Sequence, residues 1–139
     1  MAKENKILLT PTGRLSRLIP KKWKLVRTPE FKAWFGDWEN DPQNASSVVD
    51  ENGEPLVVYH GTFRGYFDIF EGAKDDKTGH LYKSGAIYFH SNPRGADFWA
   101  NTGWGRGWHG SVYPVYLNIK KPAIFRKGED WNTFKKTIN

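Results

Sequence analysis

The sequence predicts a small α+β domain, because three short apolar runs alternate with turns and with capped helix starts. Two of these runs, 48–50 and 56–59, flank Asn52-Gly53, a dipeptide typical of tight β-hairpin turns that need positive φ. The third run, 86–89, follows a glycine. Fourteen glycines and eight prolines in 139 residues also favour many turns and short elements over long helices.

The N-terminal residues 1–24 form a predicted basic arm, followed by a single domain over 25–139. Within the arm, 14–19 is expected to form one or two helical turns that Pro20 ends. Lysines then surround Trp23. Two interpretations stay open: a patch for an acidic partner or a phosphate, and a solvated arm whose Leu and Trp side chains strap onto the domain.

Thr28-Pro29 predicts a helix start, since threonine caps well and proline fits the first helical position. Aromatic residues then recur at helical spacing, which favours a packed core over a base-stacking platform. These aromatic residues are Phe31, Trp34, Phe35 and Trp38.

The remaining elements follow the same logic. The run 56–59 should be a buried strand that ends at His60, and 86–89 a second one. Asn92-Pro93 predicts a helix to about Ala100. We expect a strand over 111–119, where Pro114 indicates an edge position, another short strand over 123–125, and a surface helix or frayed end over 126–139.

The composition excludes several classes of function. The chain has no cysteine, which rules out disulfides, thiolate zinc sites and cysteine nucleophiles. No apolar run reaches the ~18 residues of a membrane span, and we expect a soluble, cytoplasmic protein. The net charge of +6 suits nucleic acid, a dinucleotide or an acidic protein. The four histidines lack metal-ligand spacing, so no metal is predicted, while ribonuclease-like acid–base chemistry stays an alternative.

His60 and Tyr88 are the most promising pair for a ligand cleft. Each ends or follows a short apolar strand, and the two strands could be neighbours in one sheet. A histidine there can donate a hydrogen bond to a sugar hydroxyl, and a tyrosine can stack on an aromatic ring. A core histidine beside a core tyrosine is the competing interpretation.

These residues carry a resemblance to a known family. YHGT at 59–62 and GAIYF at 85–89 resemble the first two NAD-binding motifs of H-Y-E type ADP-ribosyltransferases, which include poly(ADP-ribose) polymerases and diphtheria-type toxins. The ADP-ribosyltransferase domain of phage and mobile-element polyvalent proteins is the more similar relative. Its likeness extends over about residues 10–125, through LVRTPEFKAWFGDWE at 25–39, VVDENGEP at 48–55, ADF at 96–98 and YPVYLNIK at 113–120.

The resemblance implies an ADP-ribosyltransferase-like split antiparallel sheet with short helices, and it implies NAD as substrate. His60 would bind the adenosine ribose, and the Gly61 backbone the nicotinamide amide. Tyr88 would stack on the nicotinamide, with Phe98 as a second stacking aromatic. Thr62 would be the small hydroxyl residue that follows the His60-Gly61 pair. Cleavage of the nicotinamide–ribose bond would pass through an oxocarbenium-like state.

The family's third motif supplies a glutamate on a later strand, and Glu129 is the late candidate here, in a turn-like setting. Three explanations stay open: a shortened form without catalysis, a carboxylate from elsewhere or from a partner, and a module that only binds NAD or ADP-ribose. We predict mono-ADP-ribosyl transfer from NAD to a protein or nucleic acid, in a bacterial host cytoplasm. A non-catalytic module or inhibitor and a basic nucleic-acid binder or ribonuclease are the alternatives.

Overall fold

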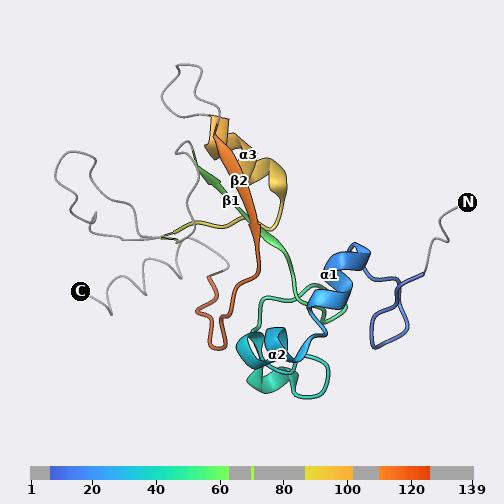
Figure 1. Cartoon of the computed structure of the whole chain (residues 1–139). Coiled ribbons are helices and arrows are strands. Elements are labelled where there is room, and N and C mark those ends of the chain that lie inside the picture. Colours follow the sequence, from blue (N-terminus) through green and yellow to red (C-terminus); the bar gives the residue numbers. More distant parts are fainter. Residues whose placement is uncertain (1–6, 63–69, 71–86, 102–109, 126–139) are drawn as a thin grey trace, which may run out of the picture. The chain divides into compact units, whose positions relative to one another are not determined.

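The computed structural model describes residues 7–62, 70, 87–101 and 110–125 (Figure 1). Over these residues the helices and strands are α1 (Pro20–Leu25), α2 (Pro29–Phe35), a 3-10 turn η1 (Pro42–Asn44), β1 (Val58–Thr62), α3 (Pro93–Asn101) and β2 (Ser111–Val115). This confirms the α+β class, with short helices and an antiparallel pair of strands. The described residues fall into two compact units: 7–54 with 118–125, and 55–117.

The first unit begins with a small hairpin in which Leu9 pairs with Leu15. Its two backbone bonds run from Thr10 N to Arg14 O, at 2.7 Å, and from Ser16 N to Leu8 O, at 2.9 Å. The helix expected over 14–19 is therefore wrong, and α1 instead begins at Pro20. The physical reason is that proline lacks an N–H and fixes φ near the helical value, so it starts a helix more readily than it continues one.

Aromatic residues of α2, with Trp38 shortly after it, form much of the core of the first unit. Phe31, Phe35 and Trp38 are buried, whereas Trp34 is about half exposed. The Phe31 and Phe35 rings stack with centroids 5.1 Å apart, and Trp38 Nε1 donates to Val26 O at 2.8 Å. Thr28 Oγ1 accepts from Phe31 N at 3.2 Å, which confirms the predicted cap. The prediction that these four aromatic residues form a packed core is thus confirmed for three of them.

The predicted Asn-Gly turn is present at the end of this unit. Gly53 has a φ of +80°, and Asp50 N donates to Glu54 O at 2.8 Å. Glu54 itself is fully buried. Its carboxylate accepts from Ser16 Oγ at 2.5 Å and pairs with Arg27 Nη2 at 2.7 Å, so each carboxylate oxygen has a partner. The strand after the turn begins at Val58, two residues later than expected.

The strand predicted over 111–119 ends at Val115. Residues 118 and 119 belong instead to the first unit, where Ile119 O accepts from Ser47 N at 2.7 Å and Asn118 Nδ2 donates to Trp34 O at 2.7 Å. These side-chain and loop partners replace a sheet ladder. The short strand expected over 123–125 is also wrong, since those residues are not in a strand. The end helix expected over 126–139 lies outside the described residues.

In the second unit β1 pairs with β2 in antiparallel register, with His60 opposite Tyr113 and Tyr59 opposite Pro114. The other side of β1 meets the chain at 87–90 by one bridge, between Tyr59 and His90. The strand predicted over 86–89 is therefore wrong for its described residues, 87–89, which lie beside β1 but outside any strand. A side chain bonds a backbone carbonyl there, as shown below.

Helix α3 packs on β1 and β2, with Ala96 and Ala100 buried against them. Asn92 Oδ1 accepts from Arg94 N at 2.8 Å, in agreement with the predicted Asn-Pro start. A Cβ at Gly61 would lie 1.7 Å from Ala96 O, and one at Gly110 would lie 2.0 Å from Ala100 O. Glycine in β1 and just before β2 thus lets the helix backbone approach closely. Within the part of the chain described, no helix is long and apolar enough to cross a membrane.

Candidate functional site

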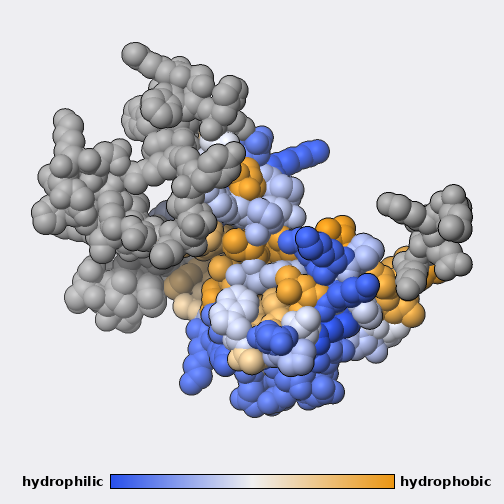
Figure 2. Space-filling view, viewed as in Figure 1, coloured by the Kyte–Doolittle hydropathy of each residue, from blue (hydrophilic) through white to orange (hydrophobic). Residues whose placement is uncertain are grey.

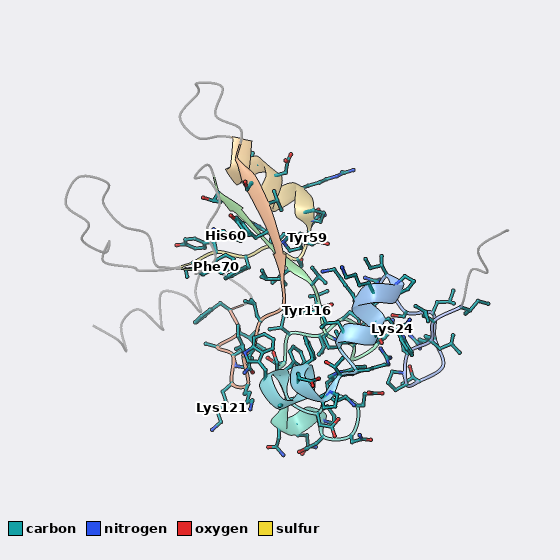
Figure 3. The ribbon with its side chains drawn as sticks, in the orientation of Figure 1. Lys24, Tyr59, His60, Phe70, Tyr116 and Lys121 are labelled. Atoms are coloured by element: carbon teal, nitrogen blue, oxygen red, sulfur yellow. The ribbon has the colours of Figure 1, made fainter. Side chains whose placement is uncertain are left out.

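His60 occupies the middle of β1, and its ring is fixed from two sides (Figure 3). Its Nδ1 lies 2.7 Å from the backbone oxygen of Tyr88. A carbonyl oxygen only accepts, so Nδ1 carries the proton and the neutral ring keeps its lone pair on Nε2. The ring also contacts Phe70 and Phe89, at centroid distances of 5.3 and 5.4 Å. In the neutral ring, Nε2 would therefore accept a bond from a sugar hydroxyl, whereas the sequence suggested a donor.

The bond from His60 lies at the point where the ladder on this side of β1 ends, beyond Tyr59. Tyr59 and His90 exchange both backbone bonds, each 2.8 Å long. Backbone groups alternate along a strand, so those of Gly61 point to the same side as those of Tyr59. The next paired residue would be Tyr88, but its carbonyl accepts from the His60 ring. Among the described residues, no backbone bond joins Gly61 to Tyr88.

The other predicted site residues that the structure describes belong to the same unit as His60. Tyr88 is 68% exposed, and Phe98 on α3 is 59% exposed. Thr62 ends β1 opposite Ser111. His60, Gly61, Thr62 and Tyr88 are thus held on adjacent backbone, and Phe98 lies two residues after the Ala96 that Gly61 contacts. Glu129 lies outside the described residues.

The site is the edge of a strand, with aromatic rings and the backbone amide of Gly61 beside it. The motif residues of the site lie within the region that matches a known family. The family described as ADP-ribosyltransferase in polyvalent proteins matches residues 50–138, which is more than half of the chain. The chain belongs to this ADP-ribosyltransferase family. No curated protein and no solved structure matches the chain. The match includes the site strands, while the resemblance noted over residues 25–39 lies before its start.

Family membership implies an ADP-ribosyltransferase role, with NAD as substrate and a macromolecule as acceptor. The carboxylate that such a transferase would use can be sought among the described residues of the second unit. There Asp97 on α3 is the sole carboxylate, and it is exposed. Over the described part of the chain, no three His, Asp or Glu side chains gather in a way that could hold a metal ion.

Sequence reasoning missed the part that His90 plays in supporting this ADP-ribosyltransferase site. His90 anchors the 87–90 segment to β1, and its ring lies where a Gly95 side chain would be, with Nδ1 2.7 Å from that position. Ala96 and Ala100 give α3 its small contact face. The sequence does predict that Ala96 and Ala100 pack, but neither they nor Gly61 in β1 and Gly110 just before β2 reveal which elements meet.

Proposed function

We propose that the protein transfers a single ADP-ribosyl group from NAD to a macromolecular acceptor, with the edge of β1 as the nicotinamide end of the site. The observation that carries the proposal is the bond from His60 Nδ1 to Tyr88 O. The histidine bonds the carbonyl at which a ladder to Gly61 would continue, and no backbone bond joins Gly61 to Tyr88 among the described residues. The strand edge then offers a backbone N–H and C=O, the pair that a carboxamide requires.

In this proposal each site residue has one task. Gly61 N–H and C=O bind the nicotinamide carboxamide, and the exposed Tyr88 ring stacks on the pyridine, with Phe98 as a second aromatic surface. His60 Nε2 accepts from a ribose hydroxyl. Thr62 Oγ1 is a further hydroxyl at the end of the strand. A carboxylate, with Glu129 as the family-based candidate, would bind the nicotinamide ribose and orient the acceptor.

The reaction breaks the bond between the ribose C1′ and the nicotinamide nitrogen, and the bonding electrons leave with nicotinamide. The ribose becomes oxocarbenium-like, and an acceptor nucleophile forms the new bond to C1′ and loses its proton to a base. The protein contributes by holding the nicotinamide so that the bond is exposed, and by orienting the acceptor.

The test distinguishes the role of His60 Nδ1, which bonds Tyr88 O, from the role of Nε2, which would bind NAD. Asparagine places an amide N–H near the position of Nδ1, and glutamine places one near Nε2. We expect His60→Asn to keep the 87–90 segment in place. It should weaken NAD binding about ten-fold, because the bond from the ribose hydroxyl to Nε2 is lost, together with the positioning of NAD that this bond provides. His60→Gln should lose binding further, because Tyr88 O is then available to Gly61 N–H. Calorimetry with NAD measures both.

Tyr88 provides the matched aromatic control. Tyr88→Phe keeps the ring face and should release nicotinamide from NAD at a rate close to that of the unaltered protein. Tyr88→Ala should reduce release by at least ten-fold, since stacking on one base contributes on the order of 1–3 kcal/mol. Release is measured with a bacterial lysate as a source of acceptors. Equal rates for the two variants would overturn the stacking assignment.

A non-catalytic NAD-binding module is a second candidate. Asp97 on α3 is the one carboxylate among the described residues of the second unit, while the carboxylates between 63 and 86 and Glu129 lie outside the described residues. Binding of NAD without nicotinamide release, with lysate present, would support the module and overturn the transferase. Absence of NAD binding would overturn both candidates.

A further inference from the structure

The first unit exposes an unusual share of aliphatic side chains in its hairpin and in α1. Leu9, Leu15, Ile19 and Leu25 are between 45 and 69% exposed. Together with the exposed basic residues Arg14, Lys21 and Lys24, they form what we name the hairpin–helix surface. Figure 2 shows hydrophobic residues in orange, interspersed with hydrophilic residues in blue, in this part of the molecule.

Two members of this surface, Leu9 and Leu15, are held next to one another by backbone geometry, and α1 is bonded to the same hairpin. Leu9 and Leu15 face each other as the pair between the two hairpin bonds, the position at which side chains in antiparallel strands come closest. The Trp23 Nε1–H donates to Leu9 O at 2.9 Å and so holds α1 beside the hairpin. None of the residues of α1 is buried. Core packing therefore does not account for these apolar side chains.

The scaffold beneath the surface is fixed by polar bonds to the turn at 50–54. Ser16 Oγ donates to Glu54 at 2.5 Å, Arg17 pairs with Glu51, and Arg27 pairs with Glu54 at 2.7 Å. The Arg27 guanidinium also lies over the Trp23 ring, 3.8 Å from its centroid. A surface whose backbone is already fixed loses little conformational entropy on binding, which favours docking.

The positive charge of residues 7–29 indicates which class of partner this surface would bind. Residues 7–29 contain six basic residues and no acidic one. Arg17 and Arg27 are neutralised by Glu51 and Glu54. Arg14, Lys21 and Lys24 form no ion pair among the described residues. A surface with an aliphatic centre and unpaired cations around it complements an acidic segment with aliphatic side chains of its own.

The side-chain chemistry favours protein over nucleic acid. Proteins that bind single strands stack bases on aromatic rings, but the large exposed groups here are leucine and isoleucine. The aromatic residue of the segment, Trp23, is engaged by Arg27 on its face and by Leu9 O at its nitrogen. Aliphatic side chains among lysines and arginines are instead suited to the apolar face of an acidic helix.

We propose that the hairpin–helix surface binds an acidic amphipathic segment of a partner protein. Apolar side chains of the partner lie on Leu9, Leu15 and Ile19, and its carboxylates pair with Arg14, Lys21 and Lys24. This surface precedes residue 50, where the match to the transferase family begins. It therefore adds partner recognition to the family domain, and it does not depend on whether that domain transfers ADP-ribose.

The experiment is a selection from a displayed library of random peptides against the full chain, followed by anisotropy with the enriched peptides. We expect sequences rich in Asp, Glu and aliphatic residues at helical spacing. Leu15→Ser should weaken their binding about ten-fold. Ile124→Ser is the matched control, because Leu15 and Ile124 are both 69% exposed. It should leave binding unchanged.

Charge is tested in the same way, with a double variant and its control of equal net charge. Lys21→Glu with Lys24→Glu should weaken the enriched peptides at least ten-fold, and Lys120→Glu with Lys121→Glu should not. Circular dichroism confirms that each variant is folded. The proposal is overturned if no acidic peptide is enriched, or if control and test variants bind alike. Tighter binding of duplex DNA or of phosphatidylserine vesicles through Leu15 and Lys21 would also overturn it.

Discussion

Replacement of Gly61 by alanine tests how closely α3 must approach β1 for the fold. The new methyl would begin 1.7 Å from Ala96 O and 2.6 Å from Ala96 C. Cβ atoms in proteins essentially never come nearer than 3.0 Å, so the helix backbone would have to retreat by more than about 1 Å. Overpacking typically costs about 1–3 kcal/mol. Because the obstacle here is backbone and cannot rotate away, we expect a loss of about 3 kcal/mol or more.

The assay is urea unfolding, followed by circular dichroism, with Gly53→Ala as the control. Gly53 has positive φ, but its Cβ position has nothing within 4 Å, so its substitution should cost only the left-handed penalty of about 1–2 kcal/mol. Gly110→Ala, which meets Ala100 O and Thr62 O, should resemble Gly61→Ala. If Gly61→Ala lowered the free energy of unfolding no more than Gly53→Ala, the close contact of helix and strand would be refuted.

Three further predictions concern the first unit, and urea unfolding measures each of them. Glu54→Gln removes the charge from a buried ion pair with Arg27 and should cost about 3 kcal/mol, so a cost under 1 kcal/mol would contradict that role. Thr28→Ala deletes the cap of α2 and should cost about 1 kcal/mol, whereas Thr28→Ser should be nearly neutral. The bond to Glu39 raises the pKa of Lys32 above its ordinary value of 10.5. This stabilisation, no more than about 0.5 kcal/mol, is present below pH 10.5 and is lost as the pH rises through the raised pKa. Lys32→Met should remove that part of the pH dependence.

The features that could be predicted from the sequence are those set by neighbouring residues. The Thr28 cap, the start at Asn92 and the turn at Gly53 each depend on one or two side chains and local backbone preferences. The buried aromatic face of α2 followed from helical periodicity. His60 was placed at a strand because an apolar run leads to it. The family motifs then suggested the ligand chemistry, which composition alone left open.

The features that were missed depend on partners distant in the sequence. The small hairpin is the exception, since Leu9 and Leu15 are close in sequence; there Pro20 was interpreted as a helix end when it is a helix start. By contrast, residues 118 and 119 continue an alternating pattern, but their backbone and side-chain bonds go to positions about 70 to 85 residues earlier. The bond from His60 to the Tyr88 carbonyl, at the point where the ladder ends, is a tertiary contact that strand propensity does not encode.

The buried Glu54 has a consequence for how the boundary of this domain is drawn. Homology begins at residue 50, but Glu54 is neutralised by Ser16 and Arg27, which precede that boundary. Ile119, well inside the homologous region, is likewise held by Ser46 and Ser47. A chain trimmed to the homologous residues would keep an acid in an apolar setting with its counter-charge removed. Ser16 and Arg27 thus belong with Glu54 and Ile119 to one compact unit that extends beyond the homologous residues.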